Sequence, residues 1–325
     1  MSTDTKMNDS SVKSVMITGA NKGIGKELAR QLAERREIER IILACRNPTK
    51  GQAAKAELEA STKRKIFEVV KFDTNDPASA RAVAESLDTP IDALVMNAGS
   101  LGGSEPSKVT ASGTTQVFAD NILGHVALLD ALLENNALRK VAVLAGSEAA
   151  RGVPKLKIKR PSFSKTSVAD LVSAIDGSYY ADKKFDPMGA FGQVKYIGAL
   201  WMAAVARQHP ELRVVTMSPG ATRGTDAPGP MPAPQRFVTE KIMMGGVFRI
   251  FGLSHSTQKG AARFAEAVTN TTYGGGRFYA SGAKTLSGPL IDQAEIFPDL
   301  ANQQFQDNAN EAVHRFLTTT ATRAL

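Results

Sequence analysis

Short apolar runs alternate with segments of helical spacing along residues 14–220, and this alternation limits the fold more than any other feature of the chain. The runs are near-continuous in Val, Ile, Leu, Ala and Met, which is typical of parallel strands buried on both faces. They are Ser14–Thr18, Arg40–Cys45, Lys65–Phe72, Ala93–Asn97, Lys140–Ala145 and Arg213–Ser218, with Arg277–Ala280 as a seventh. The pattern predicts an α/β fold, a doubly wound parallel seven-stranded sheet of Rossmann type with right-handed crossovers.

Helical spacing between these runs covers Ile24–Arg35, Gln52–Ala60, Ala78–Leu87, Val117–Leu133 and Lys259–Val268. Two stretches break the rhythm, and we interpret 152–187 as an insertion and 222–255 as a lid. Both follow C-terminal ends of strands, where open α/β sheets bind ligands, so we expect them to wall a substrate pocket. Within the lid, Phe237–Leu253 fits either a packing helix or a membrane-surface helix.

The expected organisation has three parts: a disordered tail over residues 1–12, one Rossmann-type domain over 13–285, and a C-terminal helical extension over 286–325. Cys45 is the single cysteine of the 325 residues, which excludes an intrachain disulfide and favours a reducing, cytoplasmic location. No run of 18 apolar residues predicts a transmembrane segment.

The net charge of +8 is a weak indication of nucleic-acid binding, and no aromatic-rich nucleic-acid module accompanies it, so no nucleic-acid partner is expected. Part of the excess lies in Lys155–Lys165, which is either a solvated loop or a docking site for an acidic substrate or partner. No cluster of His, Cys and carboxylates has the spacing of metal ligands, so no metal is expected.

A glycine-rich turn, Thr18-Gly19-Ala20-Asn21-Lys22-Gly23-Ile24-Gly25, follows the first predicted strand and opens the first predicted helix. Glycines allow the tight turn and the close approach of backbone amides to a pyrophosphate, which then meets the helix N-terminus. Because strand, turn and helix occur in the required order, the motif predicts a dinucleotide site. Its expected contacts are Gly19, Asn21, Lys22, Gly23, Ile24 and Gly25.

The end of the second strand selects the dinucleotide. An NAD site usually has Asp or Glu there for the ribose 2′-hydroxyl, whereas a nearby Arg suits a 2′-phosphate. The chain has Ala44-Cys45-Arg46 with no carboxylate, and Lys22 adds a second cation, so we predict NADP(H) as cofactor. Asp73, with Thr74 beside it, ends the third strand and is expected to face the adenine, where its carboxylate can accept from the amino group.

Further motifs occur in the order of a known family. Asn97-Ala98-Gly99 follows the fourth strand, Asn121 lies in a predicted helix, Ser147 follows the fifth strand, and Pro219-Gly220, with Thr222 beyond, follows the sixth. Together with Thr18–Gly25, these motifs make residues 13–285 resemble the short-chain dehydrogenase/reductase superfamily. The wording of Leu43–Arg46 and Phe191–Leu200 is most similar to its retinol dehydrogenase, carbonyl reductase and protochlorophyllide reductase branch.

The resemblance implies roles for single residues. Lys195 would bind the nicotinamide ribose and lower the pKa of a tyrosine four residues earlier, Ser147 would polarise the carbonyl oxygen, and Asn121 would hold a proton-relaying water. Cofactor contacts are implied for Asn97, Ala98, Gly99, Pro219, Gly220 and Thr222.

The resemblance also implies a reaction and an assembly. The reaction is hydride transfer between NADPH and a small carbonyl or alcohol substrate, and the apolar lid favours an apolar one. The assembly is a homodimer through the helices carrying Asn121 and Lys195, a face that the insertion could block.

Phe191 stands where the family has its proton-donating tyrosine, and a phenyl ring cannot donate a proton. General acid catalysis contributes about 10²–10⁴-fold, so we expect impaired turnover with binding retained. Three interpretations stay open: a deliberate Tyr→Phe replacement that traps a complex, a catalytically silent NADP-binding protein acting through protein interaction, or another donor such as Tyr179 or Tyr180. Tyr196 is about 100° round the helix from Lys195 and is expected to face elsewhere, and His125 is expected to be a packed core histidine.

Overall fold

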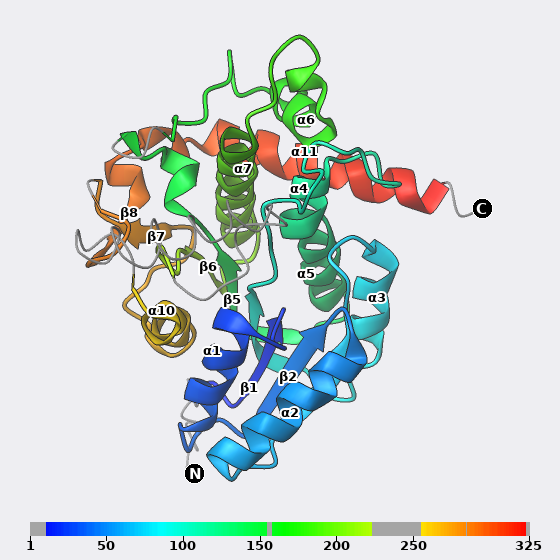
Figure 1. Cartoon of the computed structure of the whole chain (residues 1–325), viewed down its shortest axis with the longest axis vertical. Helices are drawn as coiled ribbons and strands as arrows, with labels where there is room; N and C mark the ends of the chain where they lie inside the picture. Colours follow the sequence, from blue (N-terminus) through cyan, green and yellow to red (C-terminus); the bar gives the residue numbers. More distant parts are fainter. Residues whose placement is uncertain (1–10, 155–157, 223–254, 284, 323–325) are drawn as a thin grey trace, which may run out of the picture.

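Within the part of the chain that the structure describes, eight strands form one sheet in the order β3-β2-β1-β4-β5-β6-β7-β8. The computed structural model describes residues 11–154, 158–222, 255–283 and 285–322, so residues 223–254 of the predicted lid lie outside the described residues (Figure 1). The strands are β1 Ser14–Thr18, β2 Arg40–Cys45, β3 Phe67–Lys71, β4 Ile91–Met96, β5 Leu138–Ala145, β6 Arg213–Met217, β7 Phe278–Ser281 and β8 Leu290–Asp292.

Strands β1 to β7 pair in parallel, which confirms the predicted doubly wound α/β fold. The predicted number of strands was seven, and the structure corrects it to eight. Strand β8 pairs antiparallel with β7 and has only three residues, too few for an apolar pattern to stand out in the sequence. It lies within the stretch that we assigned to the C-terminal extension.

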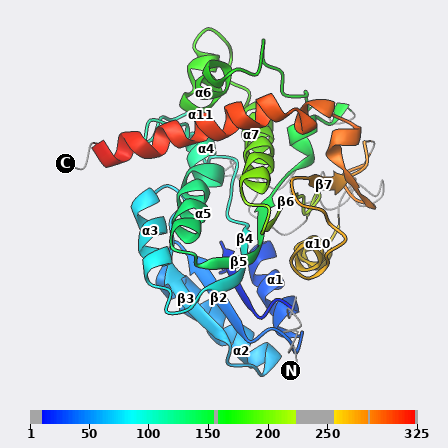
Figure 2. The ribbon, with the colours of Figure 1, turned by 180° about the vertical axis from the view of Figure 1, so that it is seen from behind.

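Helices cover both faces of the sheet (Figures 1 and 2). One face carries α1 Gly23–Ala33, α2 Pro48–Thr62 and α10 Thr257–Thr269. The helices on the other side are α3 Pro77–Glu85, α4 Gln116–Phe118, α5 Gly124–Glu134, α6 Val168–Asp176, α7 Pro187–Gln208 and α11 Gln303–Thr322. Alternate strand residues feed the two cores: Val15 and Ile17 pack toward α1 and α10, while Met16 packs toward α5.

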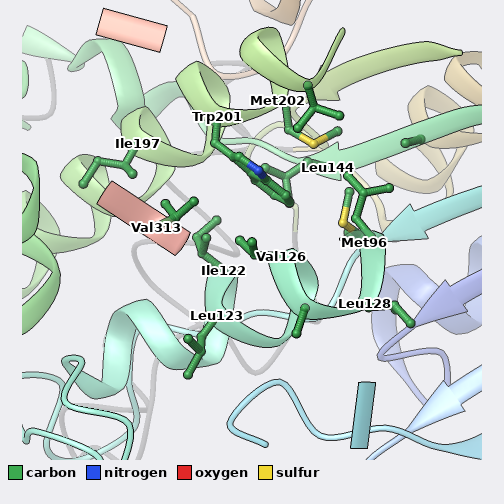
Figure 3. Close-up of a cluster of buried hydrophobic side chains, with 14 of the residues drawn as sticks. Met96, Ile122, Leu123, Val126, Leu128, Leu144, Ile197, Trp201, Met202 and Val313 are labelled. Carbon is green, nitrogen blue, oxygen red and sulfur yellow. The ribbon is translucent and has the colours of Figure 1, made fainter. Parts of the chain in front are cut away.

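The larger core lies between the sheet, α5 and α7. Figure 3 shows residues of the α5 segment facing α7 and the strand ends of β4 and β5. The labelled members from these elements are Met96, Ile122, Leu123, Val126, Leu128, Leu144, Ile197, Trp201 and Met202. Among the described residues, one helical stretch, Gln116–Glu134, is long and apolar enough to span a membrane, and 78% of it is buried inside the fold, as in a core helix.

Helix α11 crosses α7 and α6 on the outer side of this core (Figure 2). Its apolar face buries Ala312 and Val313, and Asp307 pairs with Arg207 of α7. The dimer implied by the resemblance would use α5 and α7, and any pairing there has to accommodate α11. That dimer stays a prediction.

His314 ties α11 to α5, and we expect this tie to make stability depend on pH. Its Nε2 lies 3.1 Å from Asp130 Oδ2 and its Nδ1 lies 2.6 Å from the Asn310 carbonyl oxygen. The hydrogen bond with Asp130 raises the pKa of His314 above its ordinary value, and burial opposes it. The stabilisation is therefore full below about pH 6.5, the ordinary histidine pKa, and is lost as pH rises through the folded-state pKa.

The measurement is urea unfolding of the wild-type chain and of His314→Gln between pH 5 and 9. We expect the difference in unfolding free energy to shrink as pH rises, from at most about 1 kcal/mol for a partly exposed pair. A difference that does not change with pH would contradict the assignment.

Candidate active site

The glycine turn lies at the carboxyl end of β1, where the strand order reverses because β2 flanks one side of β1 and β4 the other. Gly19 and Gly23 have φ of 67° and 57°, a region that favours glycine. Helix α1 begins at Gly23, its N-cap residue Lys22 makes no side-chain capping bond, and its first turn holds no acid. The first amides of α1 therefore face a turn without a competing carboxylate, which suits a phosphate.

Thr18 joins this turn to the segment after β4. Its carbonyl oxygen accepts from Asn97 Nδ2 at 2.9 Å, and its Oγ1 accepts from the Ala98 amide at 2.9 Å. Asn97 and Ala98 are thus hydrogen-bonded to the start of the glycine turn, and their contact with a cofactor stays a prediction.

Gly25 lets helix α1 pack closely against Asn97 and the Gly19 carbonyl group, and we expect Gly25→Ala to disrupt this packing. A Cβ at position 25 would lie 2.6 Å from both Asn97 Nδ2 and the Gly19 carbonyl oxygen, and a backbone atom cannot turn away. We expect a loss of about 1–3 kcal/mol in unfolding free energy, with weaker NADPH binding. Gly282→Ala is the matched control, since a Cβ there has no atom within 4 Å, and an equal loss in both variants would refute the packing argument.

Arg46 follows β2 directly and is exposed, with no ion pair to any described residue. The preceding Cys45 is buried, and burial raises the pKa of its thiol to about 11, so it stays neutral. Asp73, after β3, accepts from the Asn75 amide at 3.0 Å, and Thr74 accepts from the Gly124 amide at 2.9 Å. Arg46 and Asp73 thus sit at the carboxyl ends of β2 and β3, beside the glycine turn.

Asn121 lies in a π-helical turn, Ala119–Leu123, that precedes α5. Its Nδ2 donates to the carbonyl oxygens of Ser100 and Val117, at 2.6 and 2.8 Å. Its Oδ1 is buried and has no hydrogen-bond partner among the described residues. Such an atom calls for a water or a ligand group. A Cβ on Gly99 would lie 2.4 Å from this Oδ1 and 3.6 Å from Lys195 Nζ, so the absence of a side chain at Gly99 lets both polar atoms lie close to its backbone.

His125 is hydrogen-bonded to both Asn121 and Thr18, and so links Asn121 to the glycine turn. Its Nδ1 donates to the Asn121 carbonyl oxygen at 2.8 Å, because that oxygen can only accept, and its Nε2 then accepts from Thr18 Oγ1 at 2.9 Å. Burial, aided by the charge of Lys195, lowers the pKa of His125 to about 3. It is a neutral core histidine, as predicted, although the sequence did not show that it links two parts of the site.

Ser147 follows β5 and faces α7. Lys195 Nζ donates to the Ala145 carbonyl oxygen at 2.8 Å, and a Cβ on Gly192 would lie 2.8 Å from the Ala149 carbonyl oxygen. Ser147 lies between these two contact points in the chain, so the structure brings it to the face of α7 that carries Lys195. Its Oγ accepts from the Ala149 amide at 3.2 Å.

Lys195 is only 5% exposed. Burial disfavours the ammonium and lowers its pKa to about 7. The Nζ lies 5.4 Å from the centroid of the Phe191 ring, one turn earlier on the same face of α7. Asn121, Lys195 and Phe191 therefore lie together near the ends of β4 and β5, and Ser147 follows β5; their predicted roles stay predictions.

The candidate tyrosine donors lie elsewhere. Tyr180 donates to Gln193 on another face of α7, and the Tyr179 ring stacks under Lys183 Nζ at 3.8 Å. Tyr196 lies between Phe163 and Phe297, with stacked rings on both sides.

The remaining two tyrosines, Tyr273 and Tyr279, bond to Glu266 Oε2 and to the Gly274 amide. The chain has five tyrosines, all within the described residues, and each lies among partners outside the Phe191–Lys195 face.

A buried polar network, which the sequence analysis missed, supports the Pro219-Gly220 turn. Glu148 accepts from Ser218 Oγ at 2.7 Å and from the Ser281 amide at 3.1 Å, and Arg263 NH1 lies 3.9 Å from its carboxylate. Ser218 Oγ in turn accepts from the Gly220 amide at 3.0 Å. No local pattern could reveal this network, because its members are far apart in the sequence.

Thr222 pairs with His255 as an isolated bridge, and His255 Nε2 lies 2.6 Å from the Pro219 carbonyl oxygen. These contacts join the two ends of the predicted lid beside the turn.

A nicotinamide dinucleotide fits this edge of the sheet. The glycine turn and the N-terminus of α1 suit its pyrophosphate, and the unpaired amide oxygen of Asn121 and the ammonium of Lys195, both beside Gly99, suit hydroxyl groups. No group of three or more His, Cys, Asp or Glu side chains that could hold a metal is found in the described part of the chain.

Comparison with known proteins agrees with this geometry. A family model described as short chain dehydrogenase matches residues 13–176. Retinol dehydrogenase 12 of Bos taurus is 43% identical over 124 residues, which cover 37% of this chain and 38% of that protein. Retinol dehydrogenase 13 of Homo sapiens is 29% identical over 220 residues, 65% of this chain and 59% of that protein. The matches thus span well under two thirds of these relatives. Salutaridine reductase from Papaver somniferum, at 17% identity, shares the fold with a TM-score of 0.61, covering 83% of this chain and 100% of that chain.

Proposed function

Because the chain belongs to the short-chain dehydrogenase family of oxidoreductases, we propose that it transfers hydride between NADP(H) and a small apolar carbonyl or alcohol compound. The observation that carries the proposal is the placement of Lys195 Nζ and the unpartnered Asn121 Oδ1 beside Gly99, at the ends of β4 and β5, with Ser147 following β5. A chain that had lost catalysis would be free to lose several of these groups. This one lacks a single hydroxyl, at Phe191, and keeps the ring.

In this proposal the bound dihydronicotinamide supplies the hydride. Ser147 Oγ polarises the carbonyl oxygen, and Lys195 and Asn121 bind the ribose hydroxyls and a relay water. Pro219-Gly220, held by Ser218 and Glu148, limits the opposite side.

NADP(H) rather than NAD(H) is proposed because a cation, Arg46, ends β2 where an NAD site would have an acid. The apolar character of the substrate rests on the apolar sequence of the predicted lid and on the names of the relatives, which refer to retinol, an alcohol. A silent NADP-binding protein that acts through protein interaction is the second candidate, favoured by Phe191 alone.

The test is NADPH consumption with a panel of apolar aldehydes and ketones, measured beside NADPH binding. We expect slow turnover that Ser147→Ala lowers by at least about 10²-fold, the scale of one lost donor to the oxygen, with NADPH binding kept. NADPH binding without turnover on any member of the panel, even after Phe191→Tyr, would favour the second candidate.

A further inference from the structure

Phe191 leaves open which group gives a proton to the substrate oxygen, and the described structure narrows the choice. The hydroxyls of Tyr180, Tyr273 and Tyr279 are hydrogen-bonded elsewhere, and the rings of Tyr179 and Tyr196 pack against Lys183 and against Phe163 and Phe297. His125 has both ring nitrogens engaged and is neutral, so it has no proton to spare. Glu148 accepts two hydrogen bonds beside Arg263 and acts as an acceptor. Among the described residues, Lys195 is the protonated side chain that lies beside Gly99 and Asn121.

Lys195 has the arrangement that a donor needs. One N–H is used by the Ala145 carbonyl oxygen at 2.8 Å, and no other acceptor lies within bonding distance of Nζ among the described residues. Its Nζ lies beside Gly99, as does the unpartnered Oδ1 of Asn121. The Phe191 ring covers one side of Nζ at 5.4 Å and offers no competing acceptor.

We propose that Lys195 is the proton donor of this chain, taking over the role of the missing phenol. The inference rests on the proposed function. The carbonyl carbon gains a hydride, with its electron pair, from NADPH, and the carbonyl π electrons move to oxygen. The oxygen takes a proton from Lys195 Nζ, directly or through one water or ribose hydroxyl, which leaves a neutral amine and NADP⁺. The neutral amine of Lys195 then regains a proton from solvent.

The acid strength of Lys195 suits this role. Burial lowers its pKa to about 7, and a general acid works best when its pKa is near the operating pH. Few charged or titratable groups lie near Lys195. His125 of α5 lies near it as a neutral ring, and no carboxylate among the described residues pairs with Lys195. The rate should therefore fall as pH rises through about 7, when the ammonium is lost.

The deciding comparison uses Lys195→Arg in two backgrounds. Arginine keeps the positive charge and the donors for ribose hydroxyls, but it does not release a proton. In the wild-type chain we expect Lys195→Arg to lower kcat by about 10²-fold or more while NADPH affinity stays within a few-fold. In the Phe191→Tyr background the phenol donates, so the same substitution should cost far less. Lys195→Met does not enlarge the side chain, but it removes the charge and the ribose donors, so its kcat is compared at saturating NADPH.

A second readout needs no turnover. Lysine labelled with ¹³C at Cε is titrated by NMR with and without NADP⁺, and the Lys195 signal is the one lost in Lys195→Arg. Lys55→Arg, on α2 and paired with Glu59, is the control substitution. We expect a midpoint near neutral pH for the Lys195 signal, and Lys55→Arg should leave that signal in place.

Three results would overturn the proposal. They are a kcat that Lys195→Arg leaves unchanged, an ordinary lysine midpoint, and turnover that appears only after Phe191→Tyr. The last would leave the proposed function intact. Absence of turnover in both the wild-type chain and Phe191→Tyr would instead refute the proposed function itself.

Discussion

Replacing Phe191 by tyrosine should raise kcat/KM for carbonyl reduction by about 10²-fold. The phenol would lie one helical turn before Lys195. This face of α7 contacts the segment that carries Ser147, through Ala145 and Ala149. A positioned general acid is worth about 10²–10⁴-fold, and we expect the lower end because Lys195 already supplies protons in the wild-type chain. The change adds one hydroxyl to a half-buried ring, so NADPH affinity and unfolding midpoint should change little.

Tyr180→Phe is the control, because it tests whether another tyrosine contributes to the rate. Its hydroxyl donates to Gln193, away from Lys195, so its loss should leave kcat/KM unchanged in either background. A large loss on Tyr180→Phe would show that the insertion moves a tyrosine into the site during the reaction. Equal rates for the wild-type chain and Phe191→Tyr would show that position 191 does not face the substrate oxygen.

The positions of the first two strands could be predicted closely, because near-continuous apolar runs bounded by polar residues define buried parallel strands. β1 and β2 begin and end at the predicted residues. Elements that depend on contacts far along the chain were harder. β8 has three residues and is held by β7, and α6 lies in a stretch that we read only as an insertion. Its capping box, Ser167 with Asp170, was the signal that could have revealed it.

The candidate site also contains residues that could be predicted from the sequence and residues that could not. Residues that carry a motif, such as Gly25 and Lys195, could be assigned because their spacing reflects local geometry, a turn or one side of a helix. Glu148 and Arg263 could not, since their pairing arises when α10 packs beside β5 and β6. The low pKa of Lys195 was equally hidden, because burial is a property of the folded chain.

Arg46 should decide the choice of dinucleotide, and Arg46→Glu should reverse it. Arg46 is exposed at the end of β2, and an NADP 2′-phosphate bound there would gain a charge-assisted hydrogen bond. Such a bond contributes about 1.5–3 kcal/mol, so its loss alone should weaken NADPH binding by about 10–150-fold. The glutamate should also repel the phosphate while accepting from the 2′-hydroxyl of NADH, which moves the preference further.

The measurement is the Kd of NADPH and of NADH for the wild-type chain, Arg46→Glu and Arg46→Gln. Gln removes the charge without adding repulsion, so it should equalise the two affinities, while Glu should make NADH the tighter ligand. Arg40 provides the matched control: it lies at the opposite end of β2, paired with Glu68, and Arg40→Gln should leave both values unchanged. Tighter binding of NADH than NADPH by the wild-type chain would refute the role of Arg46 and the choice of NADP(H). The proposed roles of Ser147, Asn121 and Lys195 would then apply to NAD(H) in place of NADP(H).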